Sequence, residues 1–151
     1  MIETSATVTL PVDAVSAFEV ISDIAKADWL PAVRGVRHAG GPQRGVGARF
    51  EVEAGLVGRH LRGVLLVTEM VEPTRMVLVL EEGLELTITL EVTPARAGCE
   101  LRLEARYTVG GSFSGAKERA TLPAARREVA RAVEQLAAQL ARDDPSPSPR
   151  P

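Results

Sequence analysis

The strongest periodic pattern in the chain lies near its C-terminal end, over residues 122–141. Apolar side chains recur there every three or four residues, and small alanines widen the stripe they form: Val129, Val133, Leu136, Leu140, Ala125 and Ala132. This period predicts an amphipathic helix. Most other residues of the segment are good helix formers. A long helix with one apolar face needs a large apolar surface to cover.

Pro123 leaves two starting points open for this helix. Proline is accepted in the first turn of a helix, so the helix can begin there. Alternatively, residues 112–121 are helical as well, and Pro123 marks a bend.

Most of the chain before this helix alternates between apolar and polar residues, and this period of two predicts β-strands. The expected strands cover residues 2–10, 35–39, 48–54, 59–71, 76–81, 84–92 and 99–109. Short turns rich in Gly and Pro join them, including a turn at residues 94–98, which favours antiparallel neighbours. One polar face per strand indicates a sheet covered on one side only.

Two short helices are expected between the first and second strands. Asp13 can cap the first of them, because a short carboxylate accepts hydrogen bonds from free amides in the first turn. Val15, Phe18 and Ile21 share one face of this helix. Asp23 is expected to cap a second short turn.

Two stretches do not alternate: residues 64–67 and 76–80 are apolar on both faces. Three explanations stay open. The excess apolar side can form an exposed patch for self-association, which makes a second copy of the chain a candidate partner. A β-bulge, or strand propensity alone, would also produce the pattern.

Composition excludes several classes of protein. The 151 residues carry a formal net charge of −2, which gives no basis for binding nucleic acid. Cys99 is the only cysteine, so an intramolecular disulfide and a thiolate metal cluster are ruled out. No secretory signal is evident, and no apolar run approaches the ~20 residues of a membrane span, so a cytoplasmic protein without membrane insertion is expected. The polar, Pro-rich residues 143–151 are expected to be a disordered tail after a single domain of residues 1–142.

Five parts of the chain together resemble the START-like superfamily, also called SRPBCC, and within it the polyketide cyclase/dehydrase group. The resemblance is carried by residues 9–23, the Trp29-Leu-Pro segment through Val36, residues 45–50, residues 67–73 and the final helix. It implies an α+β helix-grip fold, in which a curved antiparallel sheet of about seven strands wraps around the long C-terminal helix. It also implies an apolar cavity between sheet and helix. Members of the superfamily bind lipids, polyketides, hormones or quinones, and a minority catalyse cyclisation or dehydration.

The expected wall of this cavity consists of the inward-facing residues of strands and helices. They are Phe18, Trp29, Phe50, Val52, Leu65, Met76, Leu78, Leu86, Ile88, Leu103, Tyr107, Ala125 and Val129. Any one of them is better explained as ordinary core. As a set they suit a small hydrophobic ligand. Trp29 is placed either at the cavity mouth or under a loop, and Tyr107 bonds either a ligand carbonyl or backbone.

The polar candidates for catalysis are few. His60 and Arg62 share one face of their strand, but Gly63, Leu65 and Val67 form its apolar face, so His60 is expected to point outward. His38 lies beside a Gly-rich turn and is expected to be solvated. No metal-ligand spacing and no phosphate-binding loop is present, so neither a metal nor another cofactor is expected, and no catalytic residue is assigned.

Three functions follow from these observations. The first is non-covalent binding of a small hydrophobic ligand, such as a lipid or a polyketide. The second is a polyketide cyclase or dehydratase, which needs a His, Arg, Glu or Tyr side chain in the cavity. The third is a protein-interaction module that uses its surface.

Overall fold

The computed structural model describes residues 2–27, 29, 33–56, 59–81, 85–108 and 114–142. Within these ranges, the side chains of residues 54–56, 59–61, 107, 114–118, 120, 121, 141 and 142 lie outside the description. The expected tail at residues 143–151 also lies outside the described residues.

All strands belong to one seven-stranded antiparallel sheet, in the order β1-β7-β6-β5-β4-β3-β2. Consecutive strands from β2 to β7 are neighbours, and β1 completes the sheet beside β7. The strands are β1 (Ile2–Leu10), β2 (Val33–Gly40), β3 (Arg49–Leu56), β4 (Arg59–Val71), β5 (Arg75–Leu80), β6 (Glu85–Ala95) and β7 (Gly98–Thr108). The meander predicted from the short turns is confirmed.

The connection between β1 and β2 contains α1 (Ala14–Ser22) and one turn of 3-10 helix, η1 (Ile24–Lys26). Asp13 caps α1 as predicted, because its Oδ1 accepts a hydrogen bond of 2.7 Å from the backbone N–H of Ser16. That bond lowers the pKa of Asp13 below its usual value. Asp23 precedes η1 but forms no hydrogen bond to it through its side chain, so the predicted second cap was wrong. A single 3-10 turn is held by its backbone bonds alone.

Several strand ends differ from the sequence expectation, and β2 begins two residues earlier than predicted, at Val33. The predicted turn at residues 94–98 was wrong at its start, because β6 continues through Pro94 and Ala95, which pair with Cys99 and Gly98. Pro94 is tolerated there because the pairing of β5 with β6 ends at Glu91, so the missing N–H costs no ladder bond on that side. The strand β3 also continues past residue 54 to Leu56, opposite Arg59.

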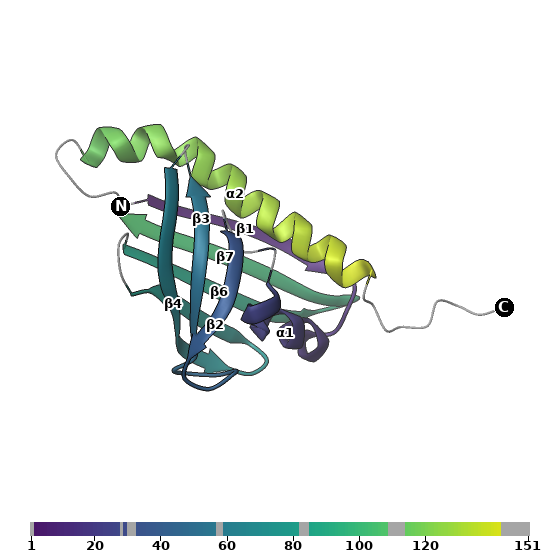
Figure 1. Ribbon diagram of the computed structural model, residues 1–151. Helices are drawn as coiled ribbons and strands as arrows, with labels where there is room; N and C mark the ends of the chain where they lie inside the picture. Colours follow the sequence, from purple (N-terminus) through teal and green to yellow (C-terminus); the bar gives the residue numbers. More distant parts are fainter. Residues whose placement is uncertain are drawn as a thin grey trace.

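The C-terminal helix α2 covers Ser114–Arg142 and contains Pro123. The second of the two starting points is therefore the correct one. Pro123 has no N–H to donate to the carbonyl of Arg119, which removes one helical hydrogen bond. Figure 1 shows that α2 changes direction in its N-terminal, green part. None of the described helices is both long and apolar enough to cross a membrane.

The sheet is strongly curved around the side on which α2 lies. Figure 1 shows β2, β3 and β4 crossing steeply over β1, β7 and β6, with α2 running along β1. The backbone of α2 lies closest to β1 and β7, while α1 packs against β6 and β7. Together these elements enclose the inner face of the sheet, and the predicted helix-grip fold is confirmed.

A bulge in β4 follows directly after the first of the two stretches that are apolar on both faces. Val67 pairs with Leu78, but the next pair joins Glu69 to Val77, so the register shifts by one residue. Before the bulge Leu65 and Val67 face the core, and after it Met70 does. On the outer face, Val77 is only 9% exposed. The outer-face residues beside it, Val79 on the same strand and Thr89 on β6, are half-buried. Self-association through this face stays a prediction.

Candidate functional site

The inner face of the sheet is built from apolar rows that run across neighbouring strands. One row crosses five strands, from β4 to β1, through Val67, Leu78, Ile88, Ala105 and Thr4. A second row lies beside it and consists of Met70, Met76, Leu90, Leu103 and Ala6. Because the strands are antiparallel and in register, these side chains share one face and form a continuous wall.

A third row crosses β2, β3, β4 and β5 and faces the same interior. It contains His38, Phe50, Leu65 and Leu80. Phe50 and Leu65 are each 1% exposed. Because this part of the sheet curls over the first two rows, the apolar side chains of the three rows pack with those of α2 in one hydrophobic cluster.

The predicted wall residues with described side chains are brought together there. Phe18, Trp29, Phe50, Val52, Leu65, Met76, Leu78, Ile88, Leu103 and Val129 belong to one buried hydrophobic cluster. Leu86 is half-buried and packs against that cluster. The side chain of Tyr107 lies outside the described residues. Whether the wall residues contact a ligand stays a prediction.

Ala125 belongs to a second, smaller cluster near the N-terminal part of α2. Among the described residues, Ala125 is buried together with Ile2, and Leu86 and Leu122 pack against them. Leu86 also packs against the main cluster, so it lies where the two clusters meet. The apolar interior is therefore less continuous at this end of α2 than at the other end.

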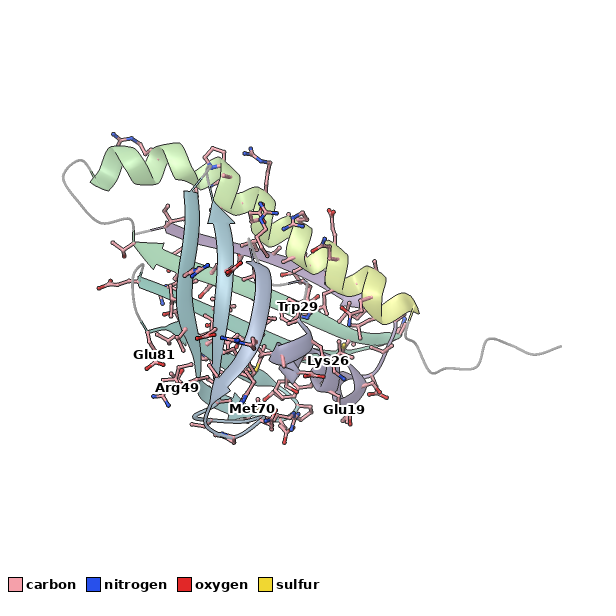
Figure 2. The ribbon with its side chains drawn as sticks, in the orientation of Figure 1. Glu19, Lys26, Trp29, Arg49, Met70 and Glu81 are labelled. Carbon is pink, nitrogen blue, oxygen red and sulfur yellow. The ribbon has the colours of Figure 1, made fainter. Side chains whose placement is uncertain are left out.

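Two buried polar atoms interrupt this apolar interior. The hydroxyl of Thr4 and the indole Nε1 of Trp29 are buried, and neither has a hydrogen-bond partner among the described residues. Trp29 is 1% exposed, and Figure 2 shows it between α1 and α2. A buried indole N–H usually has a partner, so the environment of Trp29 is unusual.

His38 was expected to be solvated, but the structure shows it half-buried. Its ring lies edge-on to Phe50, with ring centroids 5.5 Å apart. Nε2 lies 3.0 Å from the carbonyl oxygen of Pro42. Because a carbonyl oxygen can only accept, Nε2 is the donor of this hydrogen bond. The place of His38 beside Phe50 follows from the register between β2 and β3, which the sequence pattern does not give.

The other charged candidates point away from the interior. Arg62 forms an ion pair with Glu53 and its side chain is 77% exposed. On the opposite face of the same strand, Leu65 is buried, as the predicted apolar face of β4 requires. The side chain of His60 lies outside the described residues, so its orientation stays a prediction.

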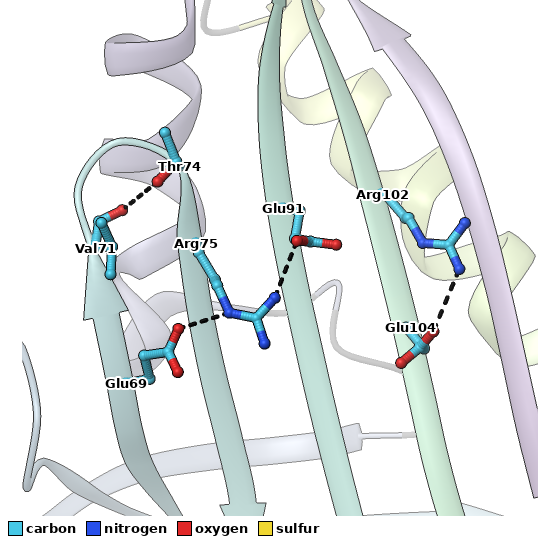
Figure 3. Close-up of polar contacts among 7 residues, drawn as sticks. All are labelled: Glu69, Val71, Thr74, Arg75, Glu91, Arg102 and Glu104. Atoms are coloured by element: carbon cyan, nitrogen blue, oxygen red, sulfur yellow. Dashed lines mark hydrogen bonds and ion pairs between the residues drawn. The ribbon is translucent and has the colours of Figure 1, made fainter.

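A bridge of charged residues crosses the outer face (Figure 3). Arg75 donates to Glu69 on β4 at 2.6 Å and to Glu91 on β6 at 2.9 Å. The hydrogen bond to Glu69 is the main reason that the pKa of Arg75 is raised. Arg49 and Glu81 form a further outer pair at 2.8 Å, seen together in Figure 2. The outer face is therefore stabilised by paired charges, while the inner face is apolar.

Several surface grooves are formed by described residues. One, of about 660 Å³, lies over β2, β3 and β4 and is lined by the pairs Arg37–Glu51 and Arg62–Glu53. The second, of about 490 Å³, separates α1 from the turn at Glu72 and Pro73.

The third groove, of about 390 Å³, lies at the ends of β5, β6 and β7. It reaches Leu80 and Leu86, which belong to the inner face. The groove thus connects the surface to two residues that pack against the buried core.

The described side chains offer little for metal or thiolate chemistry. No group of three His, Cys, Asp or Glu side chains is arranged to hold a metal ion within the described ranges. Burial, with a smaller effect from the charge of Asp13, raises the pKa of the Cys99 thiol. A thiol that keeps its proton is a poor nucleophile.

A curved sheet gripping one long helix over an apolar interior defines the helix-grip class of proteins. Solved structures share this arrangement. A protein from Thermus thermophilus, TTHA0849, aligns with a TM-score of 0.80 at 16% identity, over 93% of this chain and 98% of that one. A START superfamily protein from Mycobacterium smegmatis aligns with a TM-score of 0.73 at 16% identity, over 91% and 98%.

The Zhui aromatase/cyclase from Streptomyces sp. R1128 aligns with a TM-score of 0.73 at 15% identity, over 95% of this chain and 96% of that one. These likenesses show the fold. The family model described as "Polyketide cyclase / dehydrase and lipid transport" matches residues 1–143, and the chain belongs to this family. The predicted resemblance is confirmed. No curated protein matches the chain by sequence.

Proposed function

We propose that the protein binds a small hydrophobic ligand non-covalently, in the space between the inner face of the sheet and α2. The observation that carries this proposal is the apolar lining of the three inner-face rows. These rows extend far beyond β1 and β7, the strands against which the backbone of α2 lies closest. The family description, which includes lipid transport, supports the same function.

The groove at the ends of β5 and β6 is the proposed entrance. Leu80 and Leu86 lie at that groove and also pack against the main core. Leu86 additionally joins the smaller cluster around Ile2 and Ala125. A ligand that separates the two clusters at Leu86 would pass to the interior from this groove, which Glu85, Thr87 and Arg106 also line. Its affinity would come chiefly from apolar area removed from water, at ~25 cal/mol per Å².

Binding of an apolar fluorescent probe tests the proposal, with the single Trp29 as a second, intrinsic reporter. Ala105→Leu adds volume to the middle of the inner wall, at a position that is 2% exposed. It should weaken probe binding at least tenfold. Thr7→Leu is the matched control, because Thr7 is exposed on the outer face of β1 and should leave binding unchanged.

Circular dichroism establishes that both variants keep the fold before they are compared. A wild-type protein that binds no apolar probe would contradict the proposal. Equal loss of binding in both variants would also contradict it.

Cyclisation or dehydration of a polyketide is the second candidate function. The family description and the fold likeness to an aromatase/cyclase favour it. In this chain the supporting observation is His38, whose imidazole lies on an inner row beside Phe50. If this function holds, a poly-β-keto thioester should cyclise faster with the wild type than with His38→Ala. Equal product profiles with and without the protein would exclude it.

A further inference from the structure

Trp29 combines two properties that point to a ligand with a third that makes its signals easy to assign. It is the largest of the fully buried side chains, and it is 1% exposed. Its Nε1 has no hydrogen-bond partner among the described residues. It is also the only tryptophan in the chain, so no second indole shares its environment or its signals.

The chemistry of the indole restricts what can satisfy it. Trp Nε1 carries a hydrogen and can only donate, so its complement must be an acceptor. The side chains of its cluster are apolar, and apart from the thiol of Cys99, a weak acceptor, they present C–H groups that cannot accept a hydrogen bond of normal strength. Thr4 Oγ1 is the other buried side-chain atom without a partner in the described part of the chain, and it does not bond to Trp29.

We propose that Trp29 Nε1 donates a hydrogen bond to a carbonyl oxygen of the hydrophobic ligand. The ligand class is therefore an apolar molecule with a keto or ester oxygen, and not a plain hydrocarbon chain. This inference rests on the proposed function, because it requires a ligand in the interior. Beyond the proposed function, the inference states where the ligand carries a carbonyl oxygen, and it assigns the selection of that oxygen to Trp29.

The selection has a simple physical origin. An apolar ligand without an acceptor covers the indole and leaves its N–H unsatisfied. A ligand with a carbonyl at this point removes that cost and gains a hydrogen bond in a site of low polarity. Shape and apolar area are shared by both ligands, so the carbonyl alone makes the difference.

Fluorenone and fluorene test this point because they have nearly the same planar shape and differ by one carbonyl group. In a heteronuclear NMR spectrum the single indole N–H resonance should move downfield with fluorenone and less with fluorene. Trp29→Phe keeps an aromatic ring but removes the donor. It should weaken fluorenone binding about 3–10-fold and change fluorene binding less than about twofold, as expected for one neutral hydrogen bond.

The outcomes separate this inference from the proposed function. If both probes bind, and the indole resonance responds equally to both or Trp29→Phe weakens both equally, the carbonyl inference is wrong and the ligand site remains. If neither probe binds the wild type, the proposed function fails and the inference with it. The NMR comparison uses the wild type only, so it remains valid if Trp29→Phe does not fold.

Discussion

The imidazole of His38 meets the ring of Phe50 edge to face, with the two ring planes at 76°. The two residues are direct partners across β2 and β3. A double-mutant cycle of His38→Ala and Phe50→Leu should give a coupling energy of about 0.5–1.5 kcal/mol, because aromatic pairs of this geometry attract beyond their buried area.

Arg37 provides the control for that cycle, since it is the sequence neighbour of His38 and pairs instead with Glu51 on the outer face. Arg37→Ala combined with Phe50→Leu should be additive. Chemical denaturation of the four proteins in each cycle measures both quantities. A coupling of the same size in the Arg37 cycle would show that the His38 value does not report a ring contact.

The stripe of α2 should contribute unevenly to stability along the helix. Leu136 is fully buried in the main cluster, and Leu136→Ala should cost about 2–5 kcal/mol. Leu122 is half-buried beside the small cluster of Ile2 and Ala125. Leu122→Ala should cost less than about 2 kcal/mol because less apolar area is lost.

Urea denaturation measures both costs, and titration with an apolar probe adds the functional comparison. Leu122→Ala should change probe affinity because this residue lies near the junction at Leu86. Equal free-energy losses for the two variants, with unchanged probe affinity for Leu122→Ala, would contradict this division of the helix.

Thr4→Val should stabilise the protein without added ligand. Thr4 is 6% exposed and its hydroxyl has no partner within the described residues. Replacing that hydroxyl by a methyl group of similar size removes an unsatisfied polar group, for a gain of about 1 kcal/mol.

Thr7→Val is the matched control, because Thr7 is exposed on the opposite face of the same strand. It should change the free energy of unfolding by less than about 0.5 kcal/mol. A loss of stability in Thr4→Val that Thr7→Val does not share would mean that the Thr4 hydroxyl is satisfied in solution.

The cap of α1 should make stability depend on pH in acid. The backbone hydrogen bond from Ser16 lowers the pKa of Asp13 in the folded protein below its unfolded value. The carboxylate therefore stabilises the fold fully above its unfolded pKa, and this contribution disappears as the pH falls through the folded pKa.

Asp13→Ala should lower the melting temperature at neutral pH, and its difference from the wild type should shrink as the solution becomes acidic. Asp13→Asn keeps an acceptor for the N–H of Ser16 but does not titrate in this range, so it should retain more of the wild-type stability at neutral pH. Melting curves of the three proteins across the acidic range decide the matter. A constant difference between Asp13→Ala and the wild type would rule out the titration.

The local patterns of the sequence determined most of the fold. The turn residues on either side of β4 predicted both of its ends, at Arg59 and Val71. The residues of the apolar stripe predicted for α2 are all buried, from Ala125 to Leu140. These predictions succeed because alternation and the helical period follow directly from the geometry of the backbone, and because one face of each element is removed from water.

Tertiary structure alone decided where the polar groups of the interior lie. Register placed His38 against Phe50, and the bulge after Val67 turned Glu69 outward toward Arg75. Tertiary packing buried the indole of Trp29 without a partner among the described residues. Such features depend on which strand lies beside which and on how the sheet curves. Residues distant in sequence set both, so no local period in the chain carries that information.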